Sequence, residues 1–227
     1  MSAVRSCLAE AVARAFGSGG ALAQADVSYT ERAVQQQFAQ AVAAAIDDSE
    51  ALVAEAGTGV GKTFAYLVPL LLSGKRALVS TATKSLQDQL FLRDLPRLVD
   101  ALGAPVRVAL LKGRSSYLCL HRLQQARQGF DLPDRFALRA LSRIEAWAPS
   151  TKSGDLAEID GLDDRSPVIP LVTSTRENCL GSDCPQFTAC HVVRARREAM
   201  AAFGDGRLAS EAPLAPFWVW LILSEAP

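Results

Sequence analysis

One short segment constrains the fold of this chain more than any other part of the sequence. Residues 55–63 read EAGTGVGKT, follow a short apolar run at 51–54 and open a glycine-free apolar stretch at 62–72. This order predicts a strand, a glycine-rich turn and a helix, which is the context that a phosphate-binding loop requires. Glycines let the backbone approach a polyphosphate with its amide hydrogens inward, and the positive end of the helix adds a favourable field.

The residue types of this segment predict specific roles at a bound nucleotide. We expect Lys62 to reach the terminal phosphates and Thr63 to offer its hydroxyl to magnesium. The strict pattern has Gly at position 56, where this chain has Ala. The alternative is a glycine-rich helix cap with no chemistry, but strand, loop, Lys-Thr pair and helix all agree. We therefore predict that ATP and Mg²⁺ bind at Ala56, Gly57, Thr58, Gly59, Val60, Gly61, Lys62 and Thr63.

Helices and strands are predicted to alternate around this loop, which indicates an α/β fold with a parallel sheet built from right-handed crossovers. A leading helix is expected at 4–16, before a glycine-rich linker. Later helices are expected at 31–46, 62–72 and 84–102, and strands at 51–54, 76–80 and 106–111. After Lys112 the alternation stops, and an amphipathic helix is expected at 133–147 before a loop at 149–170.

Charge balance excludes a basic protein that coats nucleic acid, and the length of the apolar runs excludes a membrane-spanning helix. With 24 Lys and Arg against 24 Asp and Glu, the chain has no net charge and cannot coat nucleic acid through bulk charge, so any DNA contact must be local. The apolar runs at 64–72 and 214–223 are shorter than the roughly 20 residues that span a bilayer. We expect a cytoplasmic protein with no membrane partner, since residues 1–20 do not resemble a secretory signal.

Two flanking segments are weak signals on their own. Thr81 and Thr83 lie between an expected strand and a helix, where hydroxyls could hold a nucleic-acid phosphate or simply cap the helix. Arg32 and Gln35 lie upstream of the loop, where a solvated helix face is an equally good interpretation.

Taken together, five blocks in order closely resemble the DinG/YoaA type of iron-sulfur DNA helicases, in superfamily 2. The resemblance spans about residues 29–200, and in superfamily 2 helicases Ala at position 56 is no departure. The matching stretches are Arg32-x-x-Gln35, residues 55–63, residues 80–90, residues 111–119 (LKGRSSYLC) and residues 195–199 (ARREA).

The resemblance implies a fold and an activity. It implies a partial RecA-like motor domain with an inserted, mainly helical iron-sulfur lobe, and 5′–3′ unwinding of single-stranded or forked DNA in repair or replication. Arg32 and Gln35 are then expected at the nucleotide, with Gln35 reading adenine, and Thr81 and Thr83 at single-strand phosphates. The implied division is an extension at 1–28, the first half of motor domain one at 29–112, the lobe at 113–200 and an aberrant tail at 201–227.

Four of the five cysteines form a ligand pattern, and Cys7 stands outside it. Four thiolates can complete a 4Fe-4S cluster, but they can also bind zinc, and spacing alone favours iron-sulfur only modestly. Buried free thiols are the third possibility. The resemblance favours a 4Fe-4S cluster, because its ligands match these cysteines in order and spacing: Cys119, Cys179, Cys184 and Cys190.

Basic residues around the cysteines could follow a DNA backbone, although an ordinary solvated surface explains them too. These are Arg114, Arg122, Arg176, Arg194, Arg196 and Arg197. His121 and His191 each neighbour a cluster cysteine, but four cysteines already suffice as ligands.

Motifs that follow in the family do not occur in this sequence. The Asn-His-His-Leu segment and the Asp-Glu-Ala-His box are replaced by a Trp-rich ending at 203–227, so we expect a frameshifted, truncated or mispredicted end and no working helicase. A native alternative ending remains open. So do a non-catalytic module that binds nucleotide or single-stranded DNA, and a small phosphate-loop kinase, for which we find no catalytic acid.

Overall fold

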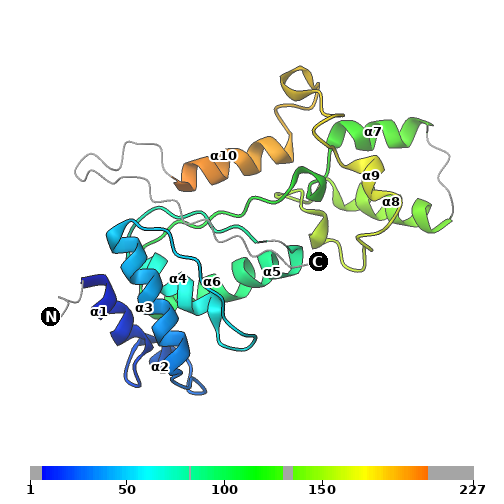
Figure 1. The fold of residues 1–227 in the computed structure, drawn as a ribbon. Helices are drawn as coiled ribbons and strands as arrows, with labels where there is room; N and C mark the ends of the chain where they lie inside the picture. The colour runs from blue at the N-terminus through cyan, green and yellow to red at the C-terminus, as the bar shows by residue number, and fades with distance from the viewer. Residues whose placement is uncertain (1–6, 82, 130–134, 204–227) are drawn as a thin grey trace. The chain divides into compact units, whose positions relative to one another are not determined.

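The computed structural model describes residues 7–81, 83–129 and 135–203, which fall into two units (Figure 1). The first unit contains the described residues up to Arg107, and the second contains those from Val108 onward. The expected lobe at 113–200 lies inside the second unit. Residues 204–227, which include most of the expected tail, lie outside the described residues, as do residues 1–6 of the expected leading helix.

Helices make up the regular structure of the first unit. They are α1 (Cys7–Phe16), α2 (Ala21–Ala25), α3 (Ala33–Asp48), α4 (Lys62–Leu72), α5 (Lys84–Gln89), the π-helical η1 (Leu90–Asp94) and α6 (Leu95–Leu102). The α3 helix packs against α1 and α4, and α6 packs against α4. Large apolar side chains on the facing sides are fully buried in this core, among them Phe16, Ile46, Tyr66, Leu67 and Leu98. The predicted helix at 62–72 is confirmed with the same bounds.

The predicted helix at 84–102 is interrupted by the wider π-helical turn η1. Pro96 has no amide hydrogen, so it cannot donate the usual bond to the carbonyl group of Leu92, and the irregular turn lies at this gap. Asp94 ends the π-helical turn and is buried. Its carboxylate accepts hydrogen bonds from Gln89 at 3.1 Å and Arg93 at 3.0 Å.

The predicted strands at 51–54, 76–80 and 106–111 are wrong for this structure. Within the described ranges these segments carry no strand and form no sheet, and Val53 is 99% exposed. The backbone groups of a strand are satisfied only by a paired neighbour, and in a parallel sheet both faces are covered. These segments have the apolar composition of buried strands, but none of them is a strand within the described residues.

The second unit is also built from helices and loops. Its elements are η2 (Arg114–Ser116), α7 (Leu120–Gly129), α8 (Arg135–Trp147), η3 (Leu156–Glu158), α9 (Ile169–Val172), η4 (Gly181–Asp183) and α10 (His191–Phe203). The predicted helix at 133–147 corresponds to α8, and the predicted loop at 149–170 contains the short helices η3 and the start of α9. Leu118, Leu123 and Ile144 are central in its main core.

A second, smaller apolar cluster in this unit joins Tyr117 to Val192 and Ala195 of α10, with Cys190 packed against it. Over the part of the chain that the structure describes, no helix combines the length and apolarity needed to cross a membrane.

Candidate functional site

The loop at 55–61 turns sharply into α4, as its sequence predicts. Gly59 and Gly61 have positive φ angles of 77° and 85°, a left-handed backbone that favours glycine. Gly61 is the N-cap of α4 and supplies no side-chain acceptor to the first turn of the helix. The first amide hydrogens of a helix lack partners within it, so the start of α4 can accept an anionic group.

Lys62 points back over this loop. Its ammonium group donates hydrogen bonds to the carbonyl oxygens of Ala56 at 2.7 Å and Gly57 at 3.3 Å. The lysine predicted to meet phosphate therefore lies on the loop that would surround the phosphate.

Arg32 and Gln35, from the start of α3, brace the loop through its backbone. Arg32 donates to the carbonyl oxygen of Gly59, and the Gln35 amide donates to that of Gly61 at 2.9 Å. Gln35 is buried and its carboxamide holds the loop, while its contact with a base stays a prediction. A hollow of about 300 Å³ lies beside this contact, lined by Arg32, Ala33, Val34, Thr58, Gly59 and Val60.

Thr63 lies next to a buried tyrosine. It shares a hydrogen bond with Tyr66, whose pKa is raised to about 12 because the phenol is buried; the Thr63 bond lowers that pKa and the nearby Asp94 raises it further. The Thr63 hydroxyl thus lies at the first turn of α4, beside the predicted phosphate position.

The two threonines predicted at DNA serve the backbone in this structure. Thr83 is the N-cap of α5, and its hydroxyl accepts a hydrogen bond from the Leu86 amide at 3.3 Å. The Thr81 hydroxyl lies 3.5 Å from the carbonyl oxygen of Thr83. The capped-helix alternative therefore describes Thr83 here, and its contact with DNA stays a prediction.

In the second unit, the four predicted ligand cysteines line one hollow of about 130 Å³. Cys119 comes from one stretch of the chain and the other three from the stretch 179–190, and all four are half-buried free thiols. Its wall also includes Arg114, His121, Arg122, Asn178, Phe187 and Arg196. Cysteine spacing and the family resemblance together predicted this grouping, and the structure brings the four residues to one hollow.

Two of these cysteines stand at the starts of helices. The carbonyl group of Cys119 accepts the first helical bond of α7, from Leu123 at 2.9 Å, and that of Cys190 accepts the first bond of α10, from Arg194 at 3.0 Å. The positive end of a helix favours a thiolate. Burial raises the pKa of the Cys119 thiol, while hydrogen bonds from the Arg122 and His121 backbone act against that shift.

Cationic groups surround the hollow as well. Arg114 donates to the Cys179 sulfur at 3.0 Å, and the Gly181 amide donates to the same atom at 3.4 Å. Arg122 donates from its Nη2 to the carbonyl oxygen of Pro170 at 3.3 Å, while its buried Nε has no partner among the described residues. These donors suit an anionic group held by thiolates.

The four thiols do not form a ready single-ion site. Within the described residues, no three His, Cys, Asp or Glu side chains are arranged to hold a metal ion. Four thiolates on one zinc, with Zn–S distances of about 2.3 Å, would have to approach to about 3.8 Å from one another. Four thiolates around one hollow are also the donor set of a 4Fe-4S cluster.

The histidines beside the cysteines differ in surroundings. His121 lines the hollow. His191 is buried, its Nδ1 lies 2.7 Å from the Arg194 guanidinium, and burial together with Arg194 lowers its pKa. Cys7, which stands outside the ligand pattern, is exposed on α1.

Sequence reasoning missed the contacts that hold the cysteine segments. The predicted loop at 149–170 supplies Gly154 and Asp155, which contact Leu118 and Lys112 far earlier in the chain. The sequence signal for these contacts was the run Ser153-Gly154-Asp155, which is typical of a tight turn.

Comparison with known proteins gives the class to which this site belongs. Residues 32–139, which include the phosphate loop, match the family described as DEAD/DEAH box helicase. That family implies a RecA-like α/β motor domain.

Relatives narrow the class further. The chain is 48% identical over 191 residues to the ATP-dependent DNA helicase YoaA of Haemophilus influenzae, and 49% identical over 188 residues to YoaA of Escherichia coli. It is 41% identical over 199 residues to the ATP-dependent helicase DinG of Mycobacterium tuberculosis. These matches cover 84%, 82% and 78% of this chain, but only 30%, 29% and 30% of the respective relatives. The chain belongs to the YoaA/DinG type of DEAD/DEAH box helicases and spans about 30% of their length.

Proposed function

We propose that this chain is a part of an ATP-dependent DNA helicase, supplying the phosphate-binding half of its first motor domain and a cysteine-ligated 4Fe-4S lobe. The observation that carries the proposal is that four cysteines from two distant stretches line one hollow in a chain that also has a phosphate loop. The YoaA and DinG relatives are helicases by name, which supports the same activity for the whole protein.

The first unit would bind the nucleotide. Phosphate groups would lie at the start of α4, with Lys62 exchanging its bonds to Ala56 and Gly57 for phosphate oxygens. Thr63 would help to hold magnesium, whose chemistry is to bridge phosphate oxygens and offset their charge. Arg32 and Gln35 would keep the loop in shape from behind.

The second unit would hold the cluster and contact DNA. Cys119, Cys179, Cys184 and Cys190 would be the ligands, and the helix starts at α7 and α10 would favour their thiolates. When bound, the cluster would tie the segment at Cys119 to the segment 179–190. Of the basic residues around the hollow, the exposed ones suit a single-strand backbone: Arg176, Arg194, Arg196 and Arg197. Arg114 and Arg122 face inward instead, toward Cys179 and Pro170.

The cluster is tested on anaerobically purified full chain. We expect a brown protein with broad absorbance near about 400 nm and about four irons per chain. Replacing any one of the four cysteines with Ser should lower iron content, while Cys7→Ser is the matched control, because Cys7 is exposed on α1 in the other unit. A colourless protein with about one zinc per chain would contradict the 4Fe-4S assignment.

The nucleotide site is tested by titration with ATP and Mg²⁺. Lys62→Ala should remove binding, because its ammonium group lies over the loop, where phosphate oxygens would replace the carbonyl oxygens that it now binds. Lys75→Ala is a suitable control, because its ammonium group binds the carbonyl oxygen of Ile46 instead. Equal binding by wild type and Lys62→Ala would refute the assignment of the loop.

A further inference from the structure

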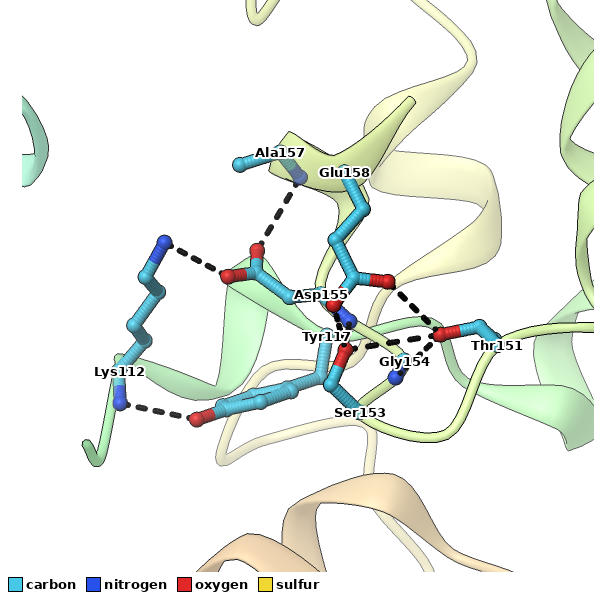
Figure 2. A network of polar contacts seen from close by, with 8 residues as sticks. All are labelled: Lys112, Tyr117, Thr151, Ser153, Gly154, Asp155, Ala157 and Glu158. Carbon is cyan, nitrogen blue, oxygen red and sulfur yellow. Dashed lines mark hydrogen bonds and ion pairs between the residues drawn. The ribbon is translucent and has the colours of Figure 1, made fainter. Parts of the chain in front are cut away.

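A buried polar network lies beside the segment that carries Cys119 (Figure 2). The Lys112 ammonium group is 2.6 Å from the Asp155 carboxylate, and the two side chains are only 3% and 13% exposed. The backbone amide of Lys112 donates a hydrogen bond to the Tyr117 hydroxyl at 3.0 Å. We call Lys112, Tyr117 and Asp155 the clasp; all three lie within the second unit.

The loop that presents Asp155 is held in shape by its own side chains (Figure 2). The Thr151 hydroxyl accepts from the Gly154 amide at 2.9 Å, and the Ser153 hydroxyl accepts from the Asp155 amide at 2.9 Å. Both hydroxyls donate to the Glu158 carboxylate. These hydrogen bonds within the loop fix the position from which Asp155 reaches the other clasp residues.

The clasp connects directly to the backbone at Cys119. Tyr117 pairs with Asp155 in an antiparallel bridge, and the Leu118 amide donates to the carbonyl group of Gly154 at 2.8 Å. One residue further on, the Cys119 amide donates to the carbonyl group of Val172 at 2.8 Å. Cys119 is thus the end of a paired segment and the start of α7.

The same loop also meets the segment of Cys190. Gly154 has φ +73°, and a Cβ atom at this position would lie 2.1 Å from the His191 ring. The Tyr117 ring lies in the apolar cluster of Val192 and Ala195, against which Cys190 packs. Two of the four cysteines are therefore placed through contacts with one loop.

Stability alone does not account for an ion pair in this position. Desolvation of two buried charges offsets most of their attraction, so apolar side chains would stabilise the unit about as well. The ion pair instead makes the pairing specific, because Lys112 and Asp155 can meet in only one register of the backbone pairing between Tyr117 and Asp155. A slip of one residue would turn each side chain of an extended segment to its opposite face. For Cys119, that slip would carry the thiol out of the hollow.

We propose that Lys112, Tyr117 and Asp155 are positioning residues that fix the register at Cys119 and so hold its thiol in the cysteine hollow. The proposal rests on the proposed function in treating this hollow as the cluster site. Its test does not need the cluster, because the position of the thiol can be measured in iron-free protein.

The experiment measures alkylation of each cysteine in the reduced, iron-free full chain by iodoacetamide, followed by mass spectrometry. Exposed Cys7 serves as the internal reference. Lys112→Met leaves the Asp155 carboxylate buried without its cation, and we expect Cys119 to react about tenfold faster or more, with Cys184 changed much less. Lys112→Arg should restore the slow rate. Arg127→Ala, which removes an exposed ion pair in the same unit, should leave it unchanged.

A purely structural role would instead speed Cys119, Cys179, Cys184 and Cys190 equally, and that result would overturn the proposal. If Lys112→Met unfolds the unit, Tyr117→Phe decides, since it removes only the hydroxyl that accepts from Lys112. Selective acceleration at Cys119 supports positioning, while no change or uniform acceleration refutes it. Iron uptake by the wild type is measured separately, so a protein that binds no iron would refute the cluster and leave the alkylation result to stand.

Discussion

Replacing each of three glycines of the phosphate loop with Ala separates two destabilising effects. One is the strain of a left-handed backbone, and the other is a clash of the new Cβ atom with a neighbouring side chain. Gly57 has neither a positive φ angle nor an atom within 4 Å of an added Cβ. Gly59 has φ +77° but open space around it. Gly61 has φ +85°, and its added Cβ would lie 2.2 Å from the Gln35 amide nitrogen.

The expected losses of unfolding free energy follow this order. Gly57→Ala should be neutral or stabilising by up to about 1 kcal/mol, because Ala restricts the unfolded chain. Gly59→Ala should cost about 1–2 kcal/mol, the usual penalty of a left-handed backbone for a residue with a Cβ atom. Gly61→Ala should cost about 1 kcal/mol more, because Gln35 must also give up its bond to the Gly61 carbonyl group.

The assay is thermal and urea unfolding without nucleotide, combined with hydrogen exchange of the α4 amides, which reports on the first unit alone. For a unit of about 100 residues, each 1 kcal/mol lowers Tm by about 4–8 °C. Gly61→Ala should therefore melt several degrees below Gly59→Ala. If the two variants melt together, Gln35 does not brace the loop and the reasoning fails.

Three other predictions concern single groups. Burial raises the pKa of Tyr66 to about 12, against about 10 in the unfolded chain, so its contribution to stability should be complete below pH 10 and lost between pH 10 and 12. Ultraviolet titration of the wild type and of Tyr66→Phe checks this prediction. A Tyr66 phenol that ionises near pH 10 in the folded chain would contradict it. Arg127→Ala should lower the stability of the second unit by less than about 1 kcal/mol in urea unfolding, because the Arg127 side chain is 57% exposed. Lys112→Met should cost about 3–5 kcal/mol, because the Lys112–Asp155 pair is buried. Equal losses would show that burial does not govern the strength of the two ion pairs. Thr83→Ala should cost about 1 kcal/mol and speed exchange of the first α5 amides, while Thr83→Ser keeps the cap; unchanged exchange in Thr83→Ala would show that the hydroxyl does not cap the helix.

Local signals in the sequence predicted the helices well, and tertiary pairing limited the rest. The bounds of α4 follow from Gly61 before it and an unbroken apolar stretch within it. The π-helical turn before Pro96 was missed, although the proline itself marks the place. The apolar runs at 51–54, 76–80 and 106–111 have strand composition, but a strand also needs a neighbour, and composition does not supply one.

The candidate site shows the same division. The cysteines were found from spacing and resemblance, and the structure groups all four around one hollow. The Lys112–Asp155 pair could not be predicted, because it joins residues far apart in a chain where Asp155 looks like an ordinary turn residue. The bond from the buried Gln35 amide to the Gly61 carbonyl group was not predicted, and the expected contact of Gln35 with a base stays a prediction.

The contact of Lys62 with its own loop has a consequence for affinity. A phosphate group competes with the carbonyl oxygens of Ala56 and Gly57 for the same ammonium group. The two carbonyl oxygens thus compete with phosphate for Lys62, and breaking their bonds to the ammonium group offsets part of the free energy of phosphate binding. If the self-bonded state is favoured by about 1.4 kcal/mol, a modest value for bonds to a charged donor, apparent affinity falls about tenfold. A change elsewhere that loosened these two bonds would tighten nucleotide binding without adding a single contact to the nucleotide.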